Sequence, residues 1–166
     1  MFLALAAIGV LFTSPSAAAP VAEPGPAGIS VPPGYKFEKA GINAYGFIRN
    51  DLWDRCLTND ASDRSRVYLA PCHWGASQQW QWNERGGGNW PELFNKATYF
   101  CLDGNGSTGL VYGHGCNGGE YQGWRYDSGN WTIYHQQSRG GRGVLDAAPE
   151  RVYIGTEDGG QTQDWL

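Results

Sequence analysis

The sequence predicts an all-β fold with threefold internal symmetry, and three observations lead to this prediction. A fourteen-residue pattern occurs at 67–80, 111–124 and 152–165, and each copy opens with Val-Tyr and closes with Gln-x-Trp. A glycine follows eight residues after the valine in every copy. Short apolar runs and glycine-rich turns fill the rest of the chain, without helical periodicity. A repeat of about 40 residues indicates units that must share one core.

Each repeat is expected to contain four short strands. The first strand lies near Phe47, Leu93 or Ile133, and the second contains Cys-Leu or, in the third repeat, Val-Leu. The third strand contains Val-Tyr and the fourth contains Gln-x-Trp. Three such units around one core imply a closed barrel, which leaves no exposed sheet edges.

The N-terminal segment has a different composition from the repeats. Residues 1–19 join an uncharged apolar run to the small residues Ser16-Ala17-Ala18-Ala19, a pattern typical of a secretory signal peptide. A buried element of the fold is the alternative, whereas a membrane span needs roughly 20 apolar residues. Residues 20–41 are rich in proline, glycine and alanine and are expected to form a flexible leader. The packed domain then covers residues 42–166 of a secreted, extracellular protein.

Charge and residue types exclude several kinds of partner. The net charge is −4 and the basic residues are scattered among acids, which argues against binding of nucleic acid. The sequence has no Cys-x-x-Cys pair and its three histidines are dispersed, so we expect no metal site and no cofactor. Beyond the N-terminal run, no segment approaches a membrane span.

The four cysteines can pair in three ways, and the repeats choose between them. Cys72 and Cys116 each lie six residues before the glutamine of Gln-x-Trp, and Cys56 and Cys101 each precede a leucine. In the third repeat both of these places hold other residues, as expected if the two cysteines form one bond. We therefore predict the disulfides Cys56–Cys72 and Cys101–Cys116, each worth roughly 3 kcal/mol on the chain-entropy account.

The threefold combination of Cys-Leu-x, Val-Tyr-x-x-x-Cys and Gln-x-Trp resembles the ricin B-type lectin domain. The resemblance extends over the predicted domain, and the segment 111–124 is especially similar to short secreted lectin-like domains. It implies a β-trefoil with twelve strands, a six-stranded barrel capped by hairpins, and up to three shallow sugar pockets. The implied function is weak, multivalent, non-catalytic binding of a galactose-type or xylan-type glycan.

The Gln-x-Trp residues are expected to be structural. Large aromatic side chains at symmetric positions usually fill a shared core, and the glutamines should satisfy buried backbone groups. This structural set comprises Gln78, Trp80, Gln122, Trp124, Gln163 and Trp165.

In the family that the sequence resembles, a sugar pocket combines three residues. They are an Asp directly after Cys-Leu, an aromatic residue two positions before the second cysteine, and an Asn directly before Gln-x-Trp. The second repeat has Asp103 at the first place, with His114 and Tyr121 at the other two and Tyr112 nearby in sequence. Asp103 also precedes a glycine-rich turn and could instead cap it.

The other two repeats depart further from this pattern. The third repeat keeps Asp146 but has Gly155 and Thr162 at the other two places. The first repeat matches at none of them, although Trp74 could replace the missing aromatic platform or pack on its own hairpin. The predicted carbohydrate contacts are Asp103, Tyr112, His114, Tyr121 and Asp146.

Two functional classes other than a lectin have to be considered for this sequence, an enzyme and a protein-binding trefoil. The adjacent acids Glu157 and Asp158 point to opposite faces of an extended backbone, so they cannot flank one glycosidic bond as a hydrolase requires. No other catalytic constellation occurs, which predicts a protein that is not an enzyme. The incomplete pockets favour the second class, a protein-binding trefoil. Such a trefoil would be an inhibitor, or the targeting subunit of a secreted toxin or enzyme, with a secreted protein as its partner.

Overall fold

The structure is a computed structural model that describes residues 45–84, 90–138 and 142–166. The expected signal peptide over residues 1–19 and the leader over residues 20–41 lie outside the described residues. Within these ranges, no helix has the length and apolar character that crossing a membrane would require.

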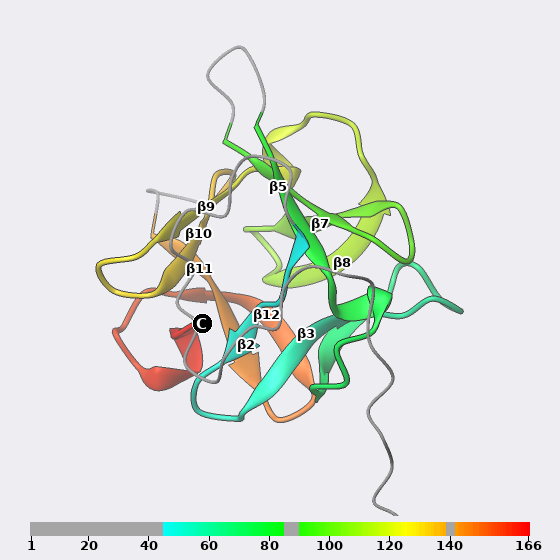
Figure 1. Cartoon of the computed structure of the whole chain (residues 1–166). Coiled ribbons are helices and arrows are strands. Elements are labelled where there is room, and N and C mark those ends of the chain that lie inside the picture. The colour runs from blue at the N-terminus through cyan, green and yellow to red at the C-terminus, as the bar shows by residue number, and fades with distance from the viewer. Residues whose placement is uncertain (1–44, 85–89, 139–141) are drawn as a thin grey trace, which may run out of the picture. The chain divides into compact units, whose positions relative to one another are not determined.

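The strands follow the three repeats in chain order (Figure 1). The first repeat contains β1 (Tyr45–Gly46), β2 (Arg49–Asn50), β3 (Arg55–Asn59), β4 (Val67–Pro71) and β5 (Trp80–Asn83). The second contains β6 (Glu92–Asn95), β7 (Phe100–Asn105), β8 (Leu110–Gly115) and β9 (Trp124–Asp127). The third contains β10 (Thr132–His135), β11 (Gly143–Ala148) and β12 (Arg151–Thr156), and its fourth strand is reduced to a bridge between Asn50 and Trp165.

Short 3-10 helices precede the Gln-x-Trp tryptophan in each repeat. They are η1 (Ala76–Gln78), η2 (Glu120–Gln122) and η4 (Gln161–Gln163). The spacing that recurs in the three sequence copies corresponds to these helices, because the glycine of each copy is the residue before its 3-10 helix. The glutamine of each copy ends that helix.

A closed ring of strand pairs forms the barrel. β1 pairs with β5, β5 with β6, and β9 with β10, all antiparallel. The amide of Trp124 donates to the carbonyl of Pro91, which joins β9 to the segment before β6. The C-terminal Leu166 exchanges two backbone hydrogen bonds of 2.8 Å with Arg49 in β2, which closes the ring beside the first strand. β1 and β2 together correspond to the first strand of the other repeats, because β1 pairs with β5 and β2 with β3. The all-β trefoil with three four-stranded repeats is therefore confirmed.

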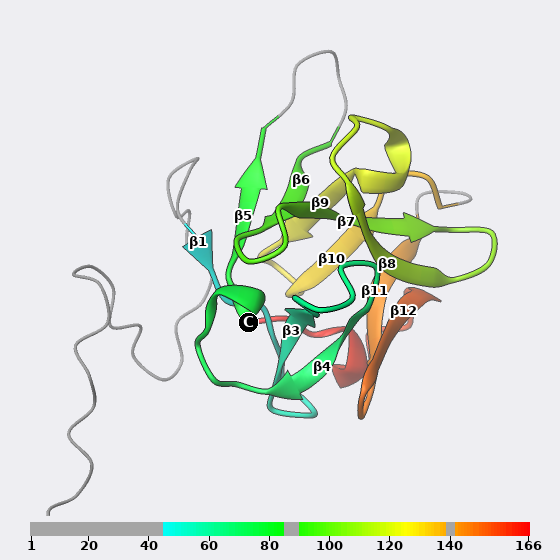
Figure 2. The ribbon, with the colours of Figure 1, turned by 90° about the vertical axis from the view of Figure 1, so that its right-hand side faces the viewer.

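Three hairpins complete the trefoil, one in each repeat. They consist of β3–β4, β7–β8 and β11–β12, and each is antiparallel. In Figure 2 the β7–β8 hairpin extends to the right, on the side opposite β1. The hairpins carry the residues that follow Cys-Leu or Val-Leu, so they hold the three places at which the family resemblance predicts sugar pockets.

The core is built around the three Gln-x-Trp tryptophans. Each is at most 1% exposed and donates its indole N–H over 2.9 Å to the carbonyl of the leucine in Cys-Leu or Val-Leu. The accepting carbonyls are those of Leu57, Leu102 and Leu145. One buried tryptophan therefore fixes each hairpin to the barrel, through both apolar packing and one satisfied buried carbonyl.

The disulfides join Cys56 to Cys72 and Cys101 to Cys116, which are the pairs that the repeat register predicts. No free cysteine remains. Each bond connects the second strand of a repeat with the segment that follows its third strand.

Replacing Trp80 by Phe should lower the free energy of unfolding by about 2–4 kcal/mol. The substitution removes the indole donor from the buried Leu57 carbonyl and leaves part of the core unfilled. Urea denaturation followed by circular dichroism measures the change. Tyr99→Phe alters an aromatic side chain that is 70% exposed and should change the unfolding free energy by less than about 0.5 kcal/mol. Equal effects of the two substitutions would contradict the role assigned to the indole.

Candidate functional site

The candidate site lies on the hairpins, at the residue that follows Cys-Leu or Val-Leu in each repeat. These residues are Thr58, Asp103 and Asp146, all less than 7% exposed. Each lies directly opposite the tyrosine of Val-Tyr on the neighbouring strand. The cross-strand pairs are Thr58 with Tyr68, Asp103 with Tyr112, and Asp146 with Tyr153. The three repeats therefore present one equivalent position opposite a tyrosine, and this position holds a threonine hydroxyl in the first repeat and a carboxylate in the other two.

The Gln-x-Trp glutamine supports this place in every repeat. Its amide nitrogen donates to the Oγ1 of Thr58 over 3.0 Å, to the Oδ2 of Asp103 over 3.1 Å and to the Oδ2 of Asp146 over 2.9 Å. These glutamines are at most 1% exposed. One carboxylate oxygen of each aspartate is thus already engaged inside the fold, and the other oxygen keeps more of its capacity to accept from a ligand.

The second carboxylate oxygen distinguishes Asp103 from Asp146. The Oδ1 of Asp146 accepts a 2.7 Å hydrogen bond from the backbone N–H of Ala147. The Oδ1 of Asp103 is buried and has no hydrogen-bond partner among the described residues. Because an unsatisfied buried acceptor costs roughly 1–3 kcal/mol, such an oxygen calls for a functional explanation.

Tyr112 lies close to the Asp103 carboxylate, and Tyr121 lies close to Tyr112. Burial, and after it a hydrogen-bonding contact with Asp103 and the charge of that carboxylate, raises the pKa of the Tyr112 hydroxyl, and Tyr121 contributes to the same rise. The Tyr112 hydroxyl nevertheless does not meet Asp103 Oδ1 at hydrogen-bonding geometry. Tyr121 is 42% exposed, so its ring is available at the surface.

The rings of the three Val-Tyr tyrosines are covered to different extents. The guanidinium of Arg66 lies over the Tyr68 ring at 4.3 Å, and that of Arg151 lies over the Tyr153 ring at 5.4 Å. Both arginines are the residue immediately before Val-Tyr. The second repeat has Leu110 at this position, 62% exposed. Tyr112 therefore lacks the arginine that covers its two counterparts.

The remaining sequence-predicted residues are placed as follows. His114 is exposed on β8, opposite Cys101, and its Nδ1 lies 3.0 Å from the carbonyl of the next residue. In the third repeat Gly155 stands at the position where the family that the sequence resembles has an aromatic residue. A Cβ built on Gly155 would lie 2.5 Å from Asp146 Oδ2, so the carboxylate occupies the space that a side chain at this position would need. The structure brings Asp103, Tyr112 and Tyr121 together, while Asp146 belongs to a separate hairpin.

His135 also supports the second-repeat site, and the sequence analysis did not identify it. This side chain is fully buried, and its Nε2 lies 3.1 Å from the carbonyl of Tyr121. Its Nδ1 lies 2.9 Å from the hydroxyl of Ser138. The equivalent residues of the other repeats are Asn50 and Asn95, whose amides donate to Thr162 and Ser77. The repeat register could have revealed it, since all three residues lie two positions after Ile48, Leu93 or Ile133.

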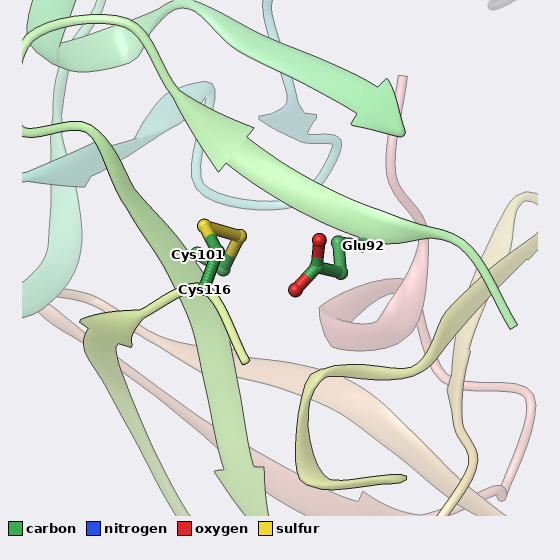
Figure 3. A group of neighbouring side chains, drawn as sticks. All are labelled: Glu92, Cys101 and Cys116. Carbon is green, nitrogen blue, oxygen red and sulfur yellow. A yellow bond between two sulfur atoms is a disulfide. The ribbon is translucent and has the colours of Figure 1, made fainter. Parts of the chain in front are cut away.

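A possible metal-binding group occurs elsewhere in the second repeat. The carboxylate of Glu92 points toward the sulfur atoms of Cys101 and Cys116 (Figure 3), all within 4.8 Å of one another. The two sulfurs are joined as a disulfide. Because the thiolate is the form of cysteine that ligates metals, this group offers no cysteine ligand.

Residues 44–165 match the family model of the ricin-type beta-trefoil lectin domain. The chain belongs to this family. Ricin-type lectin domains bind carbohydrate such as galactose, and the domain itself is non-catalytic. No curated protein matches the chain in sequence.

Solved structures share the fold of this ricin-type domain at low sequence identity. A designed threefold-symmetric protein, ThreeFoil, is 23% identical with a TM-score of 0.62, over 73% of this chain and 95% of that one. A non-toxic homologue of type II RIPs from Momordica charantia (bitter gourd), in complex with α-methyl-D-galactoside, is 20% identical with a TM-score of 0.60, over 74% and 47% of the chains. An exo-β-1,3-galactanase from Clostridium thermocellum is 20% identical with a TM-score of 0.61, over 73% and 29%. This chain thus spans less than half of these two natural chains.

The stability of this ricin-type domain should depend on pH through His135. Burial lowers the pKa of His135, with the Tyr121 carbonyl and the Asp103 charge opposing this effect. Because the folded-state pKa lies below the unfolded value of about 6.5, the unfolded state binds more protons as the solution becomes acidic. The stability contributed by neutral His135 is therefore complete above about pH 6.5 and is lost as the pH falls toward the folded-state pKa.

Replacing His135 by Asn, as in the other two repeats, should remove this part of the pH dependence. Urea midpoints of the wild type and of His135→Asn should differ most near neutral pH, and the difference should shrink as the pH falls below about 6.5. His114→Asn, which changes an exposed histidine, serves as the control for a general effect of losing an imidazole. A difference between wild type and His135→Asn that stays constant over this range would contradict the assignment.

Proposed function

We propose that the protein is a secreted, non-catalytic lectin that binds a neutral glycan through the second repeat. The observation that carries the proposal is the buried Oδ1 of Asp103, which lacks a partner among the described residues. The adjacent Tyr112 is half-buried and has Leu110 in place of the arginine that lies over Tyr68 and Tyr153. A carboxylate oxygen can accept hydrogen bonds from sugar hydroxyls, and an aromatic face can stack on the apolar face of a pyranose. The match to ricin-type lectin domains supports the same class of ligand.

Binding at Asp103 requires a local side-chain movement. Asp103 is only 3% exposed, so a hydroxyl of a ligand reaches Oδ1 when a neighbouring side chain moves aside. Tyr121 is the side chain suited to this, because it lies near Tyr112 and is 42% exposed. Rotamer changes of exposed side chains are fast, so this opening need not limit association. His114 at the rim supplies a further hydrogen-bonding group.

The first and third repeats are expected to contribute less. Thr58 replaces the aspartate in the first repeat, and Arg66 covers the opposite tyrosine. Asp146 in the third repeat has both carboxylate oxygens engaged. A single shallow site implies affinity in the millimolar to high micromolar range, about −4 to −6 kcal/mol. Useful affinity then depends on several contacts with a polymer or a glycan-coated surface.

Secretion is part of the proposal. The apolar segment and small residues of 1–19 have the pattern of a signal peptide, and the two disulfides suit an oxidising compartment. The intact mass of the secreted protein should correspond to a chain that begins near Ala19 or Pro20. A secreted product that retains Met1 would contradict the predicted cleavage.

Asp103→Asn should abolish binding of galactose-type or xylan-type ligands while the protein remains folded. The substitution keeps the shape of the side chain but removes the charge that strengthens hydrogen bonds from hydroxyl groups. A glycan array and a pull-down with insoluble polysaccharide measure binding, and Asp146→Asn is the matched control in the third repeat. Equal losses in the two variants would reject the assignment to the second repeat, and absence of binding by the wild type would reject the lectin proposal.

Leu110→Arg should also weaken glycan binding, by at least about tenfold. The substitution creates in the second repeat the arginine that covers Tyr68 and Tyr153 in the other two. The converse substitution Arg151→Leu uncovers Tyr153 but leaves both oxygens of Asp146 engaged, so it should create no new binding. Titration with the glycan identified on the array provides the measurement. Unchanged affinity of Leu110→Arg would show that the Tyr112 face is not used.

A further inference from the structure

A second surface combines one exposed and two half-buried aromatic residues of the first repeat with a lysine that follows β6. It consists of Tyr45, Phe47, Trp74, Gln79 and Lys96, and we call it the Trp74 surface. Trp74 is 55% exposed and its ring meets the Phe47 ring edge-on, with centroids 4.8 Å apart and an interplanar angle of 88°. None of these residues belongs to the second-repeat site.

The side chain of Gln79 connects the two halves of the Trp74 surface. Its amide nitrogen donates over 3.2 Å to the carbonyl of Trp74, and its oxygen accepts a 2.7 Å hydrogen bond from the ammonium of Lys96. The same ammonium lies 5.2 Å from the centre of the Tyr45 ring. The lysine is thereby held between Tyr45 and the segment that carries Trp74.

Trp74 occupies a position that the backbone reserves for glycine. Its φ is +61°, in the left-handed region. The equivalent residues of the second and third repeats, two positions after Cys116 and Glu157, are Gly118 and Gly159, with φ of +83° and +73°. A bulky residue in this conformation is strained, and such strain is commonly retained at ligand-binding sites. The tryptophan is present in spite of the local backbone preference, which points to a role for its side chain.

The charge of Lys96 specifies the kind of ligand. Lys96 is the only lysine among the described residues, and it takes part in neither of the two ion pairs found there, which are Arg49–Asp54 and Arg66–Asp60. Its neighbours in the Trp74 surface are neutral. A pyranose that carries a carboxylate could stack on the exposed Trp74 ring and pair its charge with this ammonium.

We propose that the Trp74 surface is a second binding site, selective for an acidic polysaccharide built from uronic acids. The site is independent of the proposed neutral-glycan site at Asp103. It would add a contact elsewhere on the same domain, so that two weak sites could engage a mixed polysaccharide together.

Affinity electrophoresis of the full chain in gels containing polygalacturonate tests the proposal. The wild type should be retarded by polygalacturonate, less so at high salt, and much less by its highly methyl-esterified form, which has the same backbone without the charges. Trp74→Gly and Lys96→Gln should each weaken the retardation by about tenfold or more, whereas Lys96→Arg should largely restore it. Asp103→Asn should leave it unchanged.

The stability of Trp74→Gly separates a binding role from a packing role. Glycine suits the left-handed backbone, so the melting temperature should stay the same or rise. Tyr99→Gly is the matched control, because Tyr99 is also an exposed aromatic residue with a positive φ of 60°. The proposal would be overturned by equal retardation in gels with the charged and the esterified polymer, or by retained binding of Trp74→Gly. A lower melting temperature of Trp74→Gly, or an equal loss of binding in Tyr99→Gly, would also overturn it.

Discussion

The side chain of the Gln-x-Trp glutamine is the contact on which the rest of each repeat depends. In the second repeat the oxygen of Gln122 accepts the N–H of Asn117, and its nitrogen donates both to the Gly115 carbonyl and to Asp103. The other two repeats use the same three bonds. One buried amide therefore joins a turn, a strand end and the candidate site, where leaving any of these groups unpaired would be costly.

This arrangement explains how the candidate site can vary while the fold does not. The glutamine needs only an acceptor at the place after Cys-Leu or Val-Leu, and both a threonine hydroxyl and a carboxylate satisfy it. The chemistry beyond that bond is free to differ. In this chain the second carboxylate oxygen is hydrogen-bonded in Asp146 but has no partner among the described residues in Asp103. The residue before Val-Tyr is an arginine in the first and third repeats and a leucine in the second. These few substitutions, rather than any change of backbone, make the three places unequal.

At some positions one repeat has a different residue from the other two, and the shared backbone does not explain that residue. His135 stands where the other two repeats have an asparagine, and like those asparagines it contacts a backbone carbonyl, here that of Tyr121. Unlike them, it introduces a titratable group into the core. Trp74 replaces a glycine at a left-handed position. In both cases the symmetric counterparts show what the fold alone requires, so the substituted side chain calls for a further explanation.

The sequence by itself determined the trefoil, the two disulfide pairs and the burial of the Gln-x-Trp residues. These features follow from spacing that recurs three times, and recurrence makes register visible without any tertiary information. It also located Asp103 and Asp146 as equivalent positions. It also ranked Asp103 above Asp146, because the second repeat has His114 and Tyr121 where the third has Gly155 and Thr162. Only the structure showed that Asp146 Oδ1 accepts from Ala147, while Asp103 Oδ1 has no partner among the described residues. The assembly of Tyr45, Trp74 and Lys96 was likewise decided only by the tertiary structure, since barrel closure brings together segments that no local pattern connects.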